Sequence, residues 1–326
     1  MELAWYLLLG VTFATYLVLG GADYGVGLLF ARPATDAGRR LALNALGPFL
    51  LGNEVWLVAA AGLLFGAFPT LEGALLAGLY PAVAAGLVGS LLTITAVVLR
   101  GRATGPAARA RWDRLVTVGA VLAPAGWGAV LGGLLQGVPP RGIGHGVTAF
   151  TAACALVMVA LAAAHGAAYL ALRLPAEPAR RHTELVTRLA PAALAAVGAA
   201  AAVGILSPRV RESAGRPLPA ILLLCALVVT LLAAWFAAGR GRPGWAFTAT
   251  AVALALPVLL VGAATYPYAL AQPGGGLTVA DAAADPRTLR LLGAVVLPLV
   301  PILFAVQAAG WWVFRRRTDR DAPAFF

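Results

Sequence analysis

The sequence predicts an all-α integral membrane protein with about nine transmembrane helices. Of the 326 residues, 61% are hydrophobic and only 11% are charged, whereas soluble domains carry roughly 25% charged residues. Apolar runs of about 18 residues or more, enough to span a bilayer, recur along the whole chain. The arginines lie between these runs, which is typical of membrane topology rather than of a face that binds nucleic acid.

The apolar runs predict nine helices within one polytopic membrane domain, residues 1–326, because no connection is long enough to fold separately. Internal prolines such as Pro81 and Pro124 are expected to bend their helices, which neighbouring helices then support. The glycine-rich stretch at about 272–288 is expected to be a flexible external loop. The expected helices cover residues 4–30, 46–68, 71–99, 115–136, 146–173, 189–207, 218–238, 245–271 and 289–314.

The distribution of arginine predicts the orientation of the chain. With the N-terminus outside, 18 of the 24 basic residues fall in connections on the cytoplasmic side. This three-to-one excess follows the positive-inside rule, and an odd number of helices then places the C-terminus in the cytoplasm. The six basic residues left outside are Arg141, Arg209, Arg211, Arg216, Arg287 and Arg290.

Composition and motifs exclude several kinds of site. The sequence contains no phosphate-binding glycine loop, no metal-ligand cluster and no soluble catalytic module. Cys154 and Cys225 lie within apolar segments, which argues against a disulfide framework or a zinc site. We therefore expect no catalytic residue and no metal site in this chain, membrane lipids as neighbours, and no nucleic-acid partner.

Two acidic residues lie inside the expected helices. Asp23 belongs to the first helix and Glu54 to the second, each about seven residues, or roughly 10 Å, from the cytoplasmic end. A carboxylate in hydrocarbon costs several kcal/mol, so both side chains are expected to face the bundle interior or a wet cavity. Burial and mutual repulsion favour keeping a proton on one of them, which suits a proton pathway.

The neighbours of the two acids leave a structural alternative open. Both carboxylates can instead accept hydrogen bonds from Asn53, Tyr24 or a partner backbone. The glycines near Asp23, and Gly52 in the second helix, allow either close helix packing or a local break. Trp56 can stack on a quinone headgroup, although packing is the commoner use of a buried tryptophan.

The three histidines are the only candidates for axial haem ligands of the usual kind. His145 and His165 lie about 30 Å apart along one expected helix, so they cannot bracket one haem. His182 is expected in a cytoplasmic loop. A single ligand at His165 remains an alternative to a hydrogen-bonded histidine at a helix interface, and no haem is expected in this chain.

Two motifs give the sequence a family resemblance. Residues 20–27 are Gly-Gly-Ala-Asp-Tyr-Gly-Val-Gly, and residues 47–57 are Gly-Pro-Phe-Leu-Leu-Gly-Asn-Glu-Val-Trp-Leu. With Gly62, Phe65 and residues 67–69, they resemble subunit II of the cytochrome bd-type quinol oxidases. The specific match covers about residues 15–70; beyond it only length, helix count and orientation agree.

The resemblance implies a fold, partners and cofactors. It implies two four-helix bundles plus a peripheral helix, in the bacterial cytoplasmic membrane, packed on a haem-bearing catalytic subunit I. That partner would hold two haems b and one haem d, oxidise quinol and reduce oxygen to water. This chain would support assembly and haem retention and contribute a proton route. A structural quinone and a small single-helix subunit are further expectations of the resemblance.

The sequence departs from the family pattern in two places. An acid usually lies two residues before the position of Ala22, where this chain has glycine. A Trp-Asp pair usually precedes the Gly-Asn of the second motif, and Leu50 and Leu51 take those places. Because that aspartate is a candidate for proton uptake in the family, the route either avoids this chain or depends on Asp23 and Glu54.

Two other classes of function remain as alternatives. One is a proton-coupled transporter that uses Asp23 and Glu54 as its coupling pair, and the other is a membrane scaffold without turnover. Transporters often repeat broken helices in two halves of the chain. Here the glycine-interrupted acidic segments occur only in the first two helices, which favours the oxidase subunit.

Overall fold

The computed structural model describes residues 1–30, 32, 35–138, 147–272 and 275–318. In this part of the chain nine helices are long and apolar enough to cross a membrane, as the sequence predicts. These spans are α1 (Glu2–Leu29), α3 (Leu50–Ala67), α4 (Pro69–Arg102), α5 (Pro106–Gln136), α6 (Ala149–Arg173), α7 (Ala176–Leu206), α9 (Pro217–Gly239), α10 (Pro243–Thr265) and α12 (Pro286–Val313). The other elements are α2 (Asp36–Leu46), α8 (Pro208–Ser213), β1 (Tyr268–Gln272), β2 (Gly275–Thr278) and α11 (Val279–Ala282).

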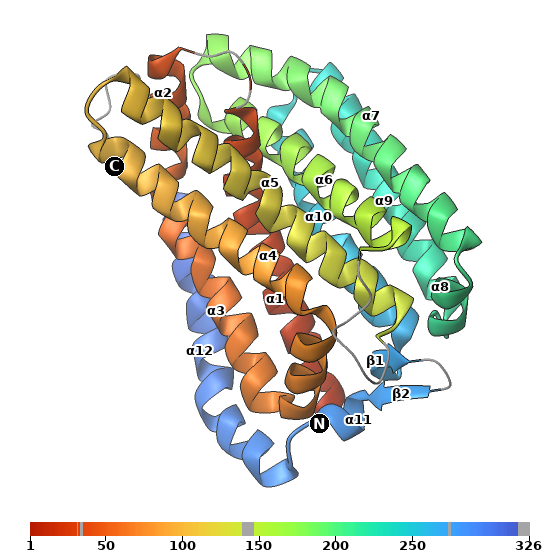
Figure 1. The fold of residues 1–326 in the computed structure, drawn as a ribbon. Helices are drawn as coiled ribbons and strands as arrows, with labels where there is room; N and C mark the ends of the chain where they lie inside the picture. Colours follow the sequence, from red (N-terminus) through yellow and green to blue (C-terminus); the bar gives the residue numbers. More distant parts are fainter. Residues whose placement is uncertain (31, 33–34, 139–146, 273–274, 319–326) are drawn as a thin grey trace.

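Helix α1 lies at the centre of the bundle, in contact with α3, α5, α6 and α10 (Figure 1). Helices α3, α4 and α5 pack in sequence on one side of α1, and α6, α7, α9 and α10 pack together on the other. Helix α12 lies at the edge and packs chiefly on α3. It is the least buried of the spans: only 6% of its most apolar stretch of 18 residues is buried. Most of its surface is therefore available to lipid or to another chain.

Glycines in α1 allow its close packing. A Cβ on Gly21 would meet Leu254 of α10, one on Gly25 would meet the backbone of α6 at Gly166, and one on Gly27 would meet Ala120 of α5. The helix is continuous from Glu2 to Leu29. Of the two alternatives for these glycines, close approach therefore applies and the local break does not.

Several helix boundaries differ from the prediction. Helices α5 and α7 begin at Pro106 and Ala176, well before the predicted 115 and 189. Their first turns are polar, so an apolar run does not detect them, yet arginine and glutamate are good helix formers. The predicted helix 46–68 is broken at 47–49: α2 ends at Leu46 and α3 begins at Leu50. Pro48 lies in this break and lacks the backbone N–H that a continuous helix needs there.

The expected flexible loop at 272–288 and the end of the predicted helix 245–271 need correction. Helix α10 ends at Thr265, just before Tyr266 and Pro267, because the residue preceding a proline disfavours helix. The chain then forms an antiparallel hairpin in which Tyr268 pairs with Thr278 and Gln272 with Gly275, and α11 follows it. The described part of this connection is therefore ordered secondary structure.

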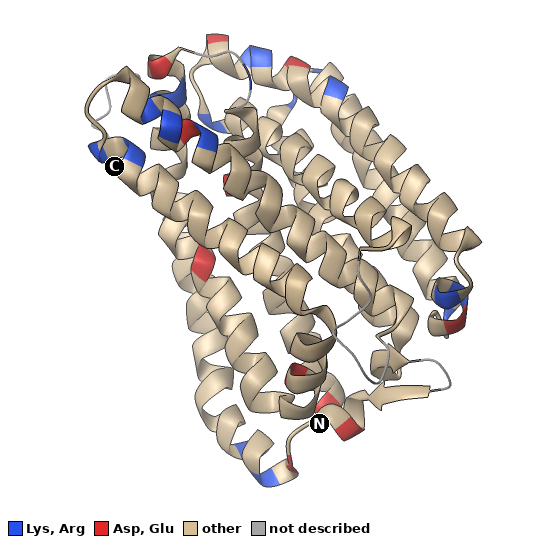
Figure 2. Ribbon diagram, viewed as in Figure 1, with Lys and Arg blue, Asp and Glu red and all other residues tan. Residues whose placement is uncertain are grey.

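The charged residues separate along the bundle. Arginines gather at the end that holds α2, the start of α7 and the end of α12, and fewer lie at the opposite end (Figure 2). Met1 lies at the end with few arginines, and the last described residues of the chain lie at the other. We call these the Met1 end and the α2 end; the predicted orientation places the α2 end in the cytoplasm.

Candidate functional site

Asp23 lies in α1 and is buried, with 2% of its surface exposed. The side-chain amide of Asn53, from α3, donates a hydrogen bond of 2.9 Å to Oδ2 of Asp23 and one of 3.3 Å to the carbonyl of Leu19. The other carboxyl oxygen, Oδ1, has no hydrogen-bond partner within the described chain. A buried carboxyl group with one unsatisfied oxygen is costly, and nothing in the described chain compensates for that oxygen.

Glu54 lies one turn into α3 and is half-buried. The hydroxyl of Tyr24 donates to its Oε1 at 3.3 Å and also lies 2.9 Å from the hydroxyl of Ser90 and 2.6 Å from that of Tyr16. Tyr16 in turn lies 2.8 Å from Ser90 and accepts a hydrogen bond of 3.1 Å from the indole of Trp127. A hydroxyl carries one proton, so these acceptors compete for the proton of Tyr24. In the contact between Tyr16 and Tyr24, either hydroxyl can be the donor.

The structure thus brings both predicted acids into one region. Asp23 and Tyr24 are adjacent on α1, and their partners Asn53 and Glu54 are adjacent on α3. Asp23 is buried as expected, whereas Glu54 is only half-buried. Hydrogen bonds to Asn53 and Tyr24, the structural alternative, are present in the structure. Tyr16, Ser90 and Trp127 were not singled out from sequence, because hydroxyl and indole groups spread over three helices form no motif.

Helix α12 contributes a polar residue that sequence reasoning missed. Gln307 accepts a hydrogen bond of 3.2 Å from the indole of Trp56 and donates one of 3.4 Å to the side-chain oxygen of Asn53. The ring of Trp56 is fully buried and lies 4.5 Å, between centroids, from that of Phe304. The packing alternative therefore describes Trp56 within this chain. A single amide within the apolar stretch 291–313 is the signal that could have identified Gln307.

Gly52 has no close-packing role within the described chain. It is exposed, and a Cβ placed on it would meet nothing within 4 Å. Leu51 beside it is 61% exposed and Val55 is 45% exposed, whereas Leu50 is fully buried. Residues three apart share a helix face, so Leu51 and Glu54 lie on the same outward side of α3.

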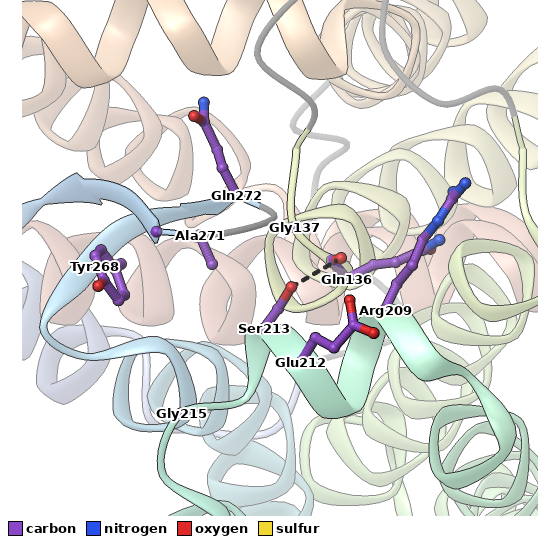
Figure 3. A pocket seen from close by; sticks show the side chains of 10 residues that line it. Gln136, Gly137, Arg209, Glu212, Ser213, Gly215, Tyr268, Ala271 and Gln272 are labelled. Carbon is purple, nitrogen blue, oxygen red and sulfur yellow. Dashed lines mark hydrogen bonds between the residues drawn. The ribbon is translucent and has the colours of Figure 1, made fainter.

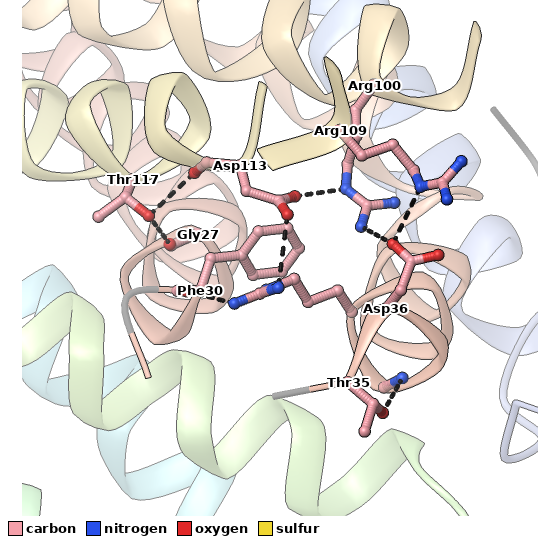
Figure 4. A network of polar contacts seen from close by, with 10 residues as sticks. Gly27, Phe30, Thr35, Asp36, Arg100, Arg109, Asp113 and Thr117 are labelled. Carbon is pink, nitrogen blue, oxygen red and sulfur yellow. Dashed lines mark hydrogen bonds and ion pairs between the residues drawn. The ribbon is translucent and has the colours of Figure 1, made fainter. Parts of the chain in front are cut away.

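A network of ion pairs lies at the α2 end (Figure 4). Arg100 of α4 is only 4% exposed and pairs with Asp113 of α5 and, at 2.7 Å, with Asp36 of α2. Arg109 approaches Asp36 at 3.3 Å, and Arg39 approaches Asp113 at 3.5 Å. The network joins the start of α2 to the α4–α5 turn. Sequence analysis assigned these residues only to connections, because charge alone does not reveal pairing.

The two described histidines lie in helices, His165 in α6 and His182 in α7 rather than in the expected loop. His165 is fully buried, its Nδ1 lies 2.8 Å from the hydroxyl of Thr250, and its ring stacks on Phe247 at 4.7 Å. One ring nitrogen is engaged and one ring face is covered, as in a helix-interface histidine, while Nε2 is buried without a hydrogen-bond partner in the described chain. His182 contacts the carbonyl of Pro178 on α7 at 2.8 Å, and His145 lies outside the described residues.

No metal site is evident in the described residues. Among them, no group of three or more His, Cys, Asp or Glu side chains is placed to hold a metal ion.

Comparison with known proteins identifies the family. A family model described as cytochrome bd terminal oxidase subunit II matches residues 1–314. Cytochrome bd ubiquinol oxidase subunit 2 of Bacillus subtilis is 26% identical over 333 residues, which is 98% of this chain and 97% of the relative. Cytochrome bd-I ubiquinol oxidase subunit 2 of Escherichia coli K12 is 27% identical over 364 residues, covering 98% and 96%.

A solved structure shares the fold. The bd oxidase from Geobacillus thermodenitrificans contains a chain that matches with a TM-score of 0.66 at 19% identity, over 94% of this chain and 97% of that one. Apolar spans and whole-length relatives together describe a multi-pass protein of the bacterial cytoplasmic membrane and its respiratory chain. The chain belongs to the cytochrome bd terminal oxidase subunit II family.

Proposed function

We propose that this chain is the non-haem subunit of a bd-type quinol:oxygen oxidoreductase. In this proposal it packs on a haem-bearing subunit I, supports assembly and haem retention there, and offers a proton route through Asp23 and Glu54. The haems, quinol oxidation and oxygen reduction belong to the partner. Family membership supports the oxidase assignment over a transporter or a scaffold.

The hydrogen bonding of the two acids carries the proton-route proposal. Asp23 lies in the interior with one unsatisfied oxygen, and Glu54 lies one turn into α3 with its side chain half-buried. Tyr24 connects Glu54 to the hydroxyl groups of Tyr16 and Ser90. Carboxyl and hydroxyl groups in such an arrangement can accept and release a proton without a mobile cation.

The position of Glu54 bears on one departure from the family pattern, the leucine at position 51. The resemblance places the family's aspartate at Leu51, which is exposed on the outward side of α3. Glu54 lies one helical turn further on the same side. We infer that Glu54 takes over the task of that aspartate, and that it exchanges its proton with a chain or cavity facing α3 while Asp23 serves the interior.

The surface of α3 and α12 supports a partner on this side. Leu51, Val55 and Val58 of α3 are exposed, as are Val306 and Trp312 of α12. An apolar membrane helix surface with a half-buried acid in it needs a polar partner or water beside that acid. The predicted orientation, with the α2 end cytoplasmic, would let protons reach Glu54 from the cytoplasm.

The test uses the intact complex with Asp23→Asn and Glu54→Gln, and Leu232→Ala on the lipid-facing side of α9 as the control. Positioned proton donors typically contribute about 10²–10⁴ in rate, so we expect quinol-dependent oxygen consumption to fall at least about tenfold in the acid variants. Haem spectra of the same variants distinguish a role in proton transfer from a role in assembly. Lost turnover with retained haem supports a proton route, and lost haem supports assembly. Unchanged turnover and spectra in both variants would reduce the acids to packing residues.

A further inference from the structure

The arginines left at the Met1 end are unevenly placed. Three of the six that the positive-inside tally leaves there, Arg209, Arg211 and Arg216, fall within the short connection between α7 and α9. Arginine on the external side of a membrane protein runs against the usual bias. A cluster of arginines at this position therefore indicates a local function for their charge.

An apolar cavity lies directly beside this connection. Its volume is about 510 Å³, and it is enclosed by α5, α6, α7, α9 and α10 with α8 at its mouth. Its floor includes the buried side chains of Leu131, Met158 and Leu227. Apart from Arg211 and one cysteine, every lining residue is apolar or glycine. This size and lining match those of small-molecule sites in proteins.

The mouth of the cavity faces the surroundings of the bundle. Ile205 at the end of α7 and Ile221 at the start of α9 both line it and are 69% and 55% exposed. Water gains little in a cavity that offers almost no polar partners. A hydrocarbon chain that enters between α7 and α9 meets a lining of its own polarity.

Arg211 is the charged group at this mouth. It is exposed and makes no ion pair within the described residues. Arg209, Glu212 and Ser213 instead line a separate polar pocket of about 260 Å³, where the Ser213 hydroxyl donates to the carbonyl of Gln136 at 3.1 Å (Figure 3).

The connection as a whole is basic. It holds three arginines and one acid, Glu212, and the guanidinium of Arg216 lies over the ring of Tyr266 at 4.9 Å. Of these arginines only Arg211 lines the cavity, and its positive charge favours an occupant with a negatively charged group.

We propose that the cavity holds an acyl chain of an anionic phospholipid whose phosphate pairs with Arg211. Guanidinium groups bind phosphate through two parallel hydrogen bonds, and basic pockets between membrane helices bind anionic headgroups. A quinone tail would suit the apolar cavity equally, but the quinone headgroup is uncharged and offers no negative charge to pair with Arg211. Charge complementarity therefore selects the phospholipid.

The proposal is tested on the intact complex in nanodiscs of phosphatidylglycerol or phosphatidylcholine, with retained lipid counted by native mass spectrometry. Ala201→Phe places a ring in the cavity, and Val229→Phe on the lipid-facing side of α9 is its control. Arg211→Gln removes the charge without adding volume, and Arg287→Gln at the start of α12 is its control.

We expect the wild-type complex to retain at least one phosphatidylglycerol that Ala201→Phe loses, and Arg211→Gln to weaken its retention about tenfold, the loss of one charged hydrogen-bonding partner. Both controls should match the wild type. If Ala201→Phe does not assemble, the comparison of Arg211→Gln with Arg287→Gln decides. Equal retention in all variants, no preference over phosphatidylcholine, or a quinone displaced by Ala201→Phe would overturn the proposal. Because lipid is counted rather than turnover, the result is independent of the proton route.

Discussion

Adding one methyl group at Gly25 should separate the two halves of the bundle. A Cβ at this position would lie 2.6 Å from both the nitrogen and the Cα of Gly166, and closer still to the carbonyl oxygen of Ala162. Ordinary contact begins at 3.4 Å, so α1 and α6 would have to part by at least 0.8 Å, the difference between the two distances. A gap of about 0.5–1 Å already forfeits a quarter to a half of the dispersion attraction between facing atoms.

The opposing atoms at Gly25 are backbone, which cannot rotate away. We therefore expect Gly25→Ala to lower the free energy of unfolding by about 3 kcal/mol, the upper end of the range for overpacked cores. Gly10→Ala in the same helix is the matched control. It would meet nothing within 4 Å and should stabilise the helix by roughly 0.5–1 kcal/mol. Melting temperatures of the purified complex compare the two, and an equal or higher value for Gly25→Ala would refute the packing argument.

Two further predictions concern polar contacts between helices. Arg100→Gln removes the buried partner of Asp36 and Asp113. It should lower the free energy of unfolding by about 3 kcal/mol, the lower end for broken buried ion pairs, because Arg39 remains near Asp113. The exposed Arg180→Gln should cost no more than about 1 kcal/mol, and equal melting temperatures for these two variants would contradict the prediction. Gln307→Leu removes both amide contacts of α12 with α3 and should cost about 0.6–1.7 kcal/mol, as such membrane hydrogen bonds do. It should lower the melting temperature more than Val306→Ala on the exposed face of the same helix; the reverse order would count against it.

Much of the candidate site was predictable because the bilayer restricts what a chain can do. Backbone groups in hydrocarbon must be satisfied internally, so each long apolar run becomes a helix. The count along α1 places Asp23 close to its predicted position, six residues before the end of the helix. Glu54 lies only four residues after the start of α3 instead of about seven, because the break at 47–49 shortens this helix. The free-energy cost of a carboxylate in hydrocarbon also predicted that both acids would have hydrogen-bond partners. Each partner is the sequence neighbour of the other acid: Asn53 donates to Asp23, and Tyr24 donates to Glu54.

The sequence by itself therefore determined the nine spans, the burial of Asp23 and the uneven distribution of arginine between the two ends. Only the tertiary structure decided which helix faces which: Gln307 beside Asn53 and Trp56, Tyr16 beside Ser90, and Arg100 between two carboxylates from α2 and α5. The physical reason is that lipid is as apolar as a neighbouring helix. The apolar pattern of a membrane helix consequently does not mark its buried face, and its rotation and neighbours are chosen by close packing and by a few polar contacts between residues far apart in the chain.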